Sequence, residues 1–339
     1  MIKIAVIGYG YWGPNIVRNF DQIEDSKVVC VCDENPKAIG RALKSHKHIQ
    51  TTGNSADIFH SPDVDAVAII TPVSTHFELA KTALLNGKHV FMEKPFTATS
   101  AQAEELMELA EKKKLVIMVD HTFIFTGAVR KMKQFLDGGI LGDLYYYDST
   151  RVNLGLFQKD VNVIWDLAPH DFAIMDYLIQ EKPVALSVSG KSHVNGKEDT
   201  AYITAHFANE MIAHFNVSWL SPVKVRTTLI SGEKRMLVWD DLEADEKLKV
   251  YDKGVDVKSG EGEYDLLINY RSGDVLAPRI DQTEALKLET EHFISCILSN
   301  KTPVNDGNAG LRVIKMLEAC DKSLAMNGQV ADIEIPIYF

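Results

Sequence analysis

The sequence predicts two domains of different class: an α/β domain over residues 1–120 and an α+β domain over residues 121–339. The first part alternates short β-branched runs with helical patterns, which is typical of βαβ units and a parallel sheet. After about Asp120 the pattern changes to long alternating segments separated by turns such as Asn195-Gly196. That change predicts a large, mainly antiparallel open sheet. At about 150 residues per domain, the length also favours two domains.

In the first domain, apolar runs are the expected strands, and helical patterns lie between them. The strands are expected at residues 2–7, 28–32, 66–70, 89–92 and 116–119. The helices are expected near residues 12–21, 37–47, 75–86 and 100–113. Thr99 and Gln102 have the spacing of a capping box, which marks the start of the last of these helices. We therefore expect a parallel sheet with helices on both faces.

In the second domain, the alternating segments are the expected strands of the open sheet. They are residues 144–151, 185–191, 201–207, 212–219, 226–230 and 236–239. Helices are expected near residues 126–137, 168–179, 283–299 and 309–326. Residues 253–265 are polar and rich in glycine, which predicts a mobile loop or a hairpin.

Composition excludes several function classes. Lys and Arg number 36 against 47 Asp and Glu, a net charge of −11, which disfavours a nucleic-acid binder or a polybasic membrane anchor. No apolar run reaches the roughly 18 residues of a membrane span, and the N-terminus lacks a signal-peptide pattern, so we expect a cytoplasmic protein. The cysteines lack zinc-site spacing, which predicts reduced packing residues and no metal site. They are Cys30, Cys32, Cys296 and Cys320.

A glycine-rich turn directly follows the first expected strand and opens a helix. It consists of Gly8, Tyr9, Gly10, Tyr11, Trp12 and Gly13. Gly8 permits the tight turn, Gly10 lets the backbone approach a pyrophosphate, and Gly13 allows the helix to pack closely on the strand. Asp33 ends the second strand, where a carboxylate binds the ribose hydroxyls of a dinucleotide. Because this charge repels a 2′-phosphate, NAD is the expected cofactor and NADP is disfavoured.

A charged pair followed by proline, Glu93-Lys94-Pro95, ends another apolar strand. Ligands of open α/β sheets bind beyond the carboxyl ends of the strands, so Lys94 is expected to face the cofactor crevice. A lysine there can hydrogen-bond a substrate hydroxyl or relay its proton. A lone lysine after a strand would otherwise be a solvated surface charge.

Asp166 and His170 lie four residues apart, a spacing that shares one face of a helix. Pro169 favours the first helical turn, which leaves open whether Asp166 lies inside the helix or just before it. Histidine is suited to accept a hydroxyl proton near neutral pH, although a lone histidine is more often a packing residue.

Taken together, these motifs resemble the Gfo/Idh/MocA family of oxidoreductases over essentially the whole chain. The matching elements are the glycine-rich turn, Thr71-Pro72 with His76, Glu93-Lys94-Pro95, and Asp166 with His170. The resemblance implies an N-terminal Rossmann domain and a catalytic set of Lys94, Asp166 and His170. It also implies that Thr71, Pro72, His76, Glu93 and Lys94 belong to the cofactor site.

Basic and polar residues flank the Asp166 element and are candidates for substrate binding, together with Lys94, Asp166 and His170. They are Arg151, Asn153, Lys159, Lys224 and Arg226. Arginine and lysine suit phosphate recognition, and these segments resemble family members that act on nucleotide sugars. That resemblance implies oxidation at carbon 3 of a UDP-N-acetylglucosamine-type sugar, a step of surface polysaccharide or lipopolysaccharide biosynthesis.

Other functions remain open. They are a dehydrogenase of a free aldose or inositol, a reductase of a 3-keto sugar, and a non-catalytic dinucleotide sensor. A nucleotide sugar requires the basic side chains to converge on one cleft, whereas a neutral polyol requires Asp and Asn instead. The expected partners are thus a small sugar or nucleotide sugar, without nucleic acid or membrane. An open sheet with one uncovered face further predicts a homodimer or homotetramer.

Overall fold

The computed structural model describes residues 1–158, 160–259 and 266–334. Contacts divide the chain into two compact units. The first contains Met1–Phe125 and Thr283–Lys315, and the second contains Thr126–Gln282 and the chain from Met316 onward. The grouping thus adds residues 283–315 to the first unit, while a domain boundary near residue 120 stays a prediction. Within the described ranges, no helix is long and apolar enough to cross a membrane.

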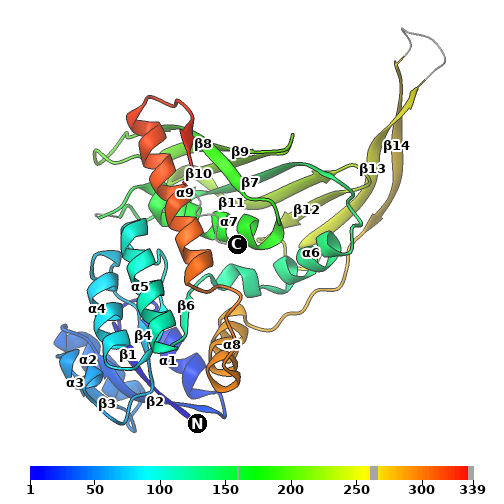
Figure 1. Cartoon of the computed structure of the whole chain (residues 1–339). Helices are drawn as coiled ribbons and strands as arrows, with labels where there is room; N and C mark the ends of the chain where they lie inside the picture. Colours follow the sequence, from blue (N-terminus) through cyan, green and yellow to red (C-terminus); the bar gives the residue numbers. More distant parts are fainter. Residues whose placement is uncertain (159, 260–265, 335–339) are drawn as a thin grey trace. The chain divides into compact units, whose positions relative to one another are not determined.

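The first unit contains a six-stranded parallel sheet in the order β3-β2-β1-β4-β5-β6 (Figure 1). The strands are β1 (Ile2–Ile7), β2 (Ser26–Cys32), β3 (Gln50–Thr52), β4 (Ala66–Ile69), β5 (His89–Met92) and β6 (Ile117–Val119). The strand order reverses between β1 and β4, which is where open α/β sheets bind their ligands. The five expected strands are confirmed, and β3, three residues long, was not expected.

Helices cover both faces of this sheet, as predicted. They are α1 (Gly13–Asp21), α2 (Pro36–Ser45), α3 (Ala56–Phe59), α4 (Val73–Leu85), α5 (Ser100–Lys113) and the late helix α8 (Ala285–Ser299), with a 3-10 turn η1 (Thr122–Phe125). Helix α1 packs against α8, and α4 packs against α5. Because βαβ crossovers are right-handed, α1 and α4 lie on opposite faces when the strand order reverses between them.

The second unit contains a nine-stranded sheet in the order β14-β13-β12-β11-β7-β10-β9-β8-β15. Its strands are β7 (Leu144–Leu154), β8 (Pro183–Lys191), β9 (Thr200–Phe207), β10 (Ile212–Ser218), β11 (Leu220–Gly232), β12 (Met236–Asp240), β13 (Leu248–Ser259), β14 (Leu266–Leu276) and β15 (Ala331–Asp332). Neighbouring strands pair antiparallel except β7 and β10, which run parallel. The predicted mainly antiparallel open sheet is confirmed.

One face of this sheet is covered by α7 (Val163–Leu178), which packs against β7, β9, β10 and also α6 (Gly127–Asp137). Phe172 of α7 contacts Phe215 of β10 edge-to-face, with ring centroids 4.9 Å apart. The last helix among the described residues is α9 (Gly307–Ala325). The helices expected near residues 126–137, 283–299 and 309–326 are confirmed.

Helix α7 begins five residues before its predicted start. The side chain of Asn162 caps it by accepting the Trp165 N–H at 3.1 Å. Pro169 therefore lies inside the helix and has no N–H to donate to the Trp165 carbonyl. As a correction, Asp166 lies in the first turn of α7 and not before it, because the Asn162 cap sets the helix start instead of the proline.

Strands β13 and β14 form a hairpin, one of the two structures predicted for residues 253–265. Residues 260–265 lie outside the described residues. The sequence did not indicate the length of these strands, because residues 253–265 are polar and rich in glycine, which is typical of a loop.

Candidate active site

The glycine-rich turn after β1 leaves no room for side chains at two of its glycines. Gly8 has φ of 100°, and a Cβ there would lie 2.2 Å from the Ile70 carbonyl oxygen. A Cβ on Gly13 would lie 2.5 Å from the carbonyl oxygen of Gly8. At Gly10, in contrast, an added Cβ would meet nothing within 4 Å. Gly8 and Gly13 therefore pack closely against backbone atoms, whereas Gly10 faces open space.

Helix α1 begins directly after this turn, and no side chain caps it. Its N-cap residue, Trp12, makes no side-chain hydrogen bond to the first turn. The side chains of Tyr11 and Trp12 are exposed and contact each other edge-to-face at 5.3 Å. An uncapped helix N-terminus beside an open glycine fits the pyrophosphate of a dinucleotide.

Asp33 connects the end of β2 to the glycine-rich turn. Its Oδ2 accepts the N–H of Tyr9 at 2.7 Å, and its Oδ1 accepts the N–H of Asn35 at 2.8 Å. A carboxylate oxygen can accept more than one hydrogen bond, so both retain capacity for ribose hydroxyls. The Tyr9 side chain is buried, and Tyr9 reaches Asp33 through its backbone.

His76 of α4 links the ends of β4 and β5. Its ring is fully buried, with Nδ1 2.9 Å from the Pro95 carbonyl oxygen and Nε2 2.8 Å from that of Thr71. Burial lowers the pKa of His76, and the carbonyl contacts oppose this. His76 therefore holds Thr71 and Pro72 in place relative to Pro95, the residue after Lys94.

Three carboxyl groups next to Lys94 form a cluster that was not predicted. They belong to Glu93, Asp120 and Glu289. Burial raises the pKa of Glu93 well above its usual range, the Asp120 carboxylate adds to the rise, and Lys94 opposes it. Burial and Asp120 also raise the pKa of Glu289, which belongs to the late helix α8. Thr122 donates its hydroxyl to Glu289 and Asn305 donates its amide to Glu289 Oε1 at 3.0 Å. Burial therefore favours the protonated forms of Glu93 and Glu289 in the folded protein.

In the second unit, α7 brings Asp166 and His170 together. Both lie inside the helix, four residues apart, so they project from the same face. Trp219, at the junction of β10 and β11, donates its indole N–H to Asp166 Oδ2 at 3.1 Å. The sequence did not indicate a role for Trp219, because β8 and β9 lie between α7 and β10 along the chain.

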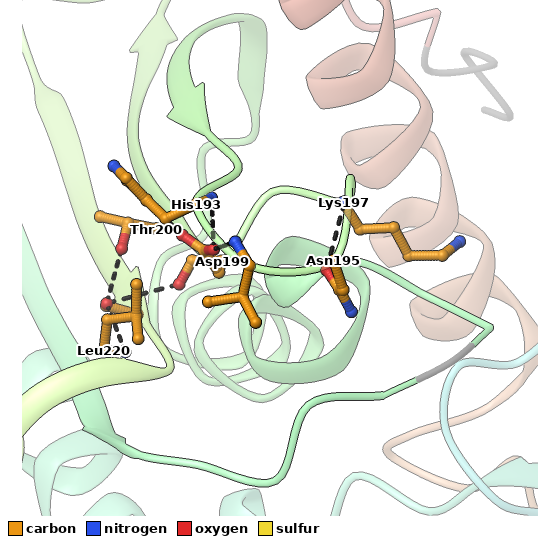
Figure 2. Close-up of polar contacts among 8 residues, drawn as sticks. His193, Asn195, Lys197, Asp199, Thr200 and Leu220 are labelled. Atoms are coloured by element: carbon orange, nitrogen blue, oxygen red, sulfur yellow. Dashed lines mark hydrogen bonds and ion pairs between the residues drawn. The ribbon is translucent and has the colours of Figure 1, made fainter.

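The turn between β8 and β9 is held by the buried carboxylate of Asp199 (Figure 2). Asp199 accepts the backbone N–H groups of His193 and Val194 at 2.6 and 3.1 Å, and its Oδ1 lies 2.7 Å from His193 Nδ1. The Asp199 carbonyl in turn accepts the N–H of Trp219 at 2.9 Å. The Asp199 turn therefore supports the backbone from which the Trp219 indole reaches Asp166.

Two of the basic residues expected to bind substrate, Arg151 and Arg226, make ion pairs with carboxylates. Arg151 and Arg226 are opposite each other on β7 and β11, so they lie on the same face of the sheet. Arg151 makes a buried bidentate pair with Asp171, with distances of 2.7 and 2.8 Å. Arg226 contacts Asp241 at 2.6 Å.

The other substrate candidates differ in exposure. Lys224 is exposed, Asn153 is half-buried, and Lys159 lies outside the described residues. The described residues therefore do not form one uncompensated cluster of positive charge around Arg151 and Arg226.

No described group of His, Cys, Asp and Glu has the geometry to hold a metal ion. The four cysteines are free thiols. Burial raises the pKa of Cys30 to about 11 and that of Cys32 to about 12, as for packing residues.

Comparison with known proteins identifies the family. Residues 2–121 match the model of the Gfo/Idh/MocA oxidoreductase family with an NAD-binding Rossmann fold, and residues 129–238 match the model of its C-terminal domain. The chain belongs to the Gfo/Idh/MocA family. It is accordingly an NAD(P)-dependent dehydrogenase, with the cofactor bound by the Rossmann domain.

Several relatives cover nearly the whole chain. The UDP-N-acetylglucosamine 3-dehydrogenase of Acidithiobacillus ferrooxidans is 28% identical over 317 residues, covering 92% of this chain and 94% of that protein. Its solved structure has a TM-score of 0.80 at 25% identity, covering 97% and 99% of the two chains. The scyllo-inositol 2-dehydrogenase (NAD(+)) of Bacillus subtilis is 25% identical, covering 89% and 88%. Levoglucosan dehydrogenase, solved with NADH, shares the fold with a TM-score of 0.82 at 20% identity, covering 98% and 99%.

Proposed function

We propose that this protein uses NAD to oxidise the carbon-3 hydroxyl of a UDP-N-acetylglucosamine-type nucleotide sugar. The observation that carries the proposal is the placement of Asp166 and His170 one helical turn apart on the same face of α7, so that a carboxylate and a proton acceptor can reach one sugar. Similarity to a UDP-N-acetylglucosamine 3-dehydrogenase over 92% of this chain supports the choice of substrate. Such a step would serve the synthesis of surface polysaccharide or lipopolysaccharide.

The choice of NAD over NADP rests on Asp33. Its carboxylate accepts hydrogen bonds from ribose hydroxyls but repels a phosphate on the 2′ position. We propose that the glycine-rich turn, with Tyr9, Tyr11 and Trp12, lies along the pyrophosphate. Thr71, Pro72, His76, Glu93 and Lys94 complete the proposed cofactor site.

The proposed chemistry divides between the cofactor and three side chains. Nicotinamide, when bound, accepts the hydride from the carbinol carbon. His170 accepts the hydroxyl proton, and Lys94 donates a hydrogen bond to the same oxygen as negative charge develops on it. Asp166 accepts a hydrogen bond from a neighbouring substrate hydroxyl and so holds the sugar in position. Run in reverse, the same residues would reduce a 3-keto sugar.

A second candidate function is the oxidation of a free aldose or inositol. The specific observation in its favour is that Arg151 and Arg226 are each paired with a carboxylate, Asp171 and Asp241. A nucleotide sugar would need its phosphates bound by Asn153, Lys159 or Lys224, or would need the Arg226 pair to open. The scyllo-inositol 2-dehydrogenase relative supports this alternative.

We also propose a cytoplasmic homodimer or homotetramer formed through the open sheet. Tyr146, Tyr202 and Ile212 lie on the face of the sheet opposite Phe215, and all three are exposed. Exposed apolar groups on one face favour association. Light scattering would test this directly, and a monomer at micromolar concentration would contradict it.

A substrate panel tests the proposed function. Purified protein with NAD is given UDP-N-acetylglucosamine, free N-acetylglucosamine, glucose, myo-inositol or scyllo-inositol, and NADH absorbance is followed. Since NADH that stays bound would limit turnover, a single-turnover signal counts as activity. The proposal predicts a signal with the nucleotide sugar and none with the inositols. A signal with an inositol and with no nucleotide sugar would establish the second candidate instead.

A further inference from the structure

We propose that Trp219 is a positioning residue that fixes the carboxylate of Asp166 for the reaction. Its indole N–H donates to Asp166 Oδ2 at 3.1 Å, and its side chain is 1% exposed. The inference rests on the proposed function, since Asp166 is a proposed member of the catalytic set. An indole donor suits this task because it does not titrate and cannot act as an acceptor.

The backbone of Trp219 is held on both sides. Its N–H donates to the Asp199 carbonyl at 2.9 Å, and its carbonyl accepts the N–H of Gly155 at 3.0 Å. The preceding hydroxyl, Ser218 Oγ, lies 2.8 Å from Thr200 Oγ1 and accepts the N–H of Leu220 at 3.0 Å. Thr200 and Leu220 are both visible beside the Asp199 turn in Figure 2.

The indole ring is equally confined. A Cβ on Gly155 would lie 2.7 Å from Trp219 Cδ1, so the ring packs directly on the glycine backbone. Phe157 covers another side, with ring centroids 5.3 Å apart. The backbone bonds and the ring contacts together hold the Trp219 indole in the orientation that directs its N–H toward Asp166 on α7.

Helix α7 provides its own control for this interaction. The neighbouring residue, Trp165, also donates its indole N–H to a carboxylate, Asp321 Oδ2, at 2.9 Å. Both are indole-to-carboxylate bonds at the first turn of α7, although the Trp165 bond is exposed and the Trp219 bond is partly buried. The Asp321 carboxylate has no proposed part in the reaction.

The kinetic test therefore compares Trp219→Phe with Trp165→Phe, using UDP-N-acetylglucosamine and NAD. A hydrogen bond to a charged group is strong enough that its loss should lower kcat about tenfold or more in Trp219→Phe. Trp165→Phe should keep kcat within about threefold of wild type. Equal effects of the two variants would overturn the inference.

A second measurement needs no substrate. The chain has four tryptophans, and each indole N–H gives one signal in a ¹H–¹⁵N spectrum, assigned by replacing each tryptophan with phenylalanine. Asp166→Ala should move the Trp219 indole signal and leave that of Trp165 in place. An unmoved Trp219 signal would overturn the inference whatever the substrate is.

Two variants distinguish a wrong role for Asp166 from a wrong role for Trp219. If Asp166→Ala keeps wild-type turnover, the proposed role of Asp166 is wrong. If Asp166→Ala is slow while Trp219→Phe has wild-type turnover, the role of Asp166 stands and the inference about Trp219 is wrong.

Discussion

The carboxylate of Asp33 accepts the backbone N–H of Tyr9 at 2.7 Å, so the end of β2 holds the glycine-rich turn that follows β1. A second oxygen of the same carboxylate accepts the N–H of Asn35. One side chain therefore has two tasks: it shapes the turn, and it presents negative charge where a ribose would bind. Cofactor preference and turn geometry are coupled through this residue.

Replacing Asp33 with alanine should weaken NADH binding much more than NADPH binding. The variant loses the acceptor for ribose hydroxyls and also the charge that repels a 2′-phosphate. We expect the ratio of the two Kd values, measured by nicotinamide fluorescence, to change by about tenfold or more. An unchanged ratio would show that Asp33 does not select the cofactor.

Gly10→Ala and Gly8→Ala should separate cofactor binding from folding. The Cβ of an alanine at position 10 points into open space, so the melting temperature should stay close to wild type while the affinity for NADH falls at least about tenfold. An alanine at position 8 would meet the Ile70 carbonyl and should lower the melting temperature. Full NADH affinity in Gly10→Ala would place the pyrophosphate elsewhere.

Glu289→Gln should flatten the dependence of stability on pH. Because the pKa of Glu289 is raised in the folded protein, the folded state holds a proton that the unfolded chain releases. The resulting stability is complete below the ordinary carboxyl pKa and is lost as pH rises toward the folded value. Between about pH 5 and about pH 8, the melting temperature of the wild type should thus fall more than that of the variant.

The matched control for this variant is Glu291→Gln on the same helix, where Glu291 is half-buried and pairs with Lys287 at 3.9 Å. It should retain the wild-type slope. If Glu289→Gln also retains that slope, Glu289 does not hold the proton.

Arg151→Met should destabilise the second unit strongly. It leaves the buried Asp171 carboxylate without its bidentate partner, which typically costs about 3–5 kcal/mol of unfolding free energy. Adding Asp171→Leu removes the uncompensated charge and should recover most of this loss, as measured by urea unfolding. A double variant no more stable than Arg151→Met would contradict a structural role for the pair.

Lys94→Ala and His170→Ala should each lower turnover by at least about a hundredfold. Binding of NADH should persist in both, since the phosphate turn and Asp33 are untouched. The Kd should stay within about threefold of wild type in His170→Ala, which lies outside the proposed cofactor site. Near-normal turnover in either variant would remove that residue from the proposed catalytic set.

The parts of the fold that were predictable depend on local signals. The turn from Gly8 to Gly13 needs only the strand before it and the helix after it, and all three are adjacent in sequence. Pro169 favours a helix start near residue 168, whereas the Asn162 side chain caps α7 further upstream, so the predicted start is wrong. The lengths of β13 and β14 were not predicted, because the polar, glycine-rich residues 253–265 fit a loop as well as a hairpin.

The sequence did not identify the residues that contact the predicted site residues. The sequence identifies Arg151 and Arg226 as cations but not Asp171 and Asp241 as the carboxylates that pair with them. Trp219 lies at the junction of β10 and β11, and it contacts Asp166 although their residue numbers differ by 53. Contacts of this range follow from strand order, which the residues alone did not specify.

The most direct test of the central claim is the origin of the hydride. UDP-N-acetylglucosamine carrying deuterium at carbon 3 is mixed with the protein and NAD, and the reduced cofactor is examined by mass spectrometry after denaturation. If the hydride comes from carbon 3, the NADH is one mass unit heavier than that formed from unlabelled sugar. Reduced cofactor without deuterium, or NADH formed from an inositol but from no nucleotide sugar, would contradict the central claim.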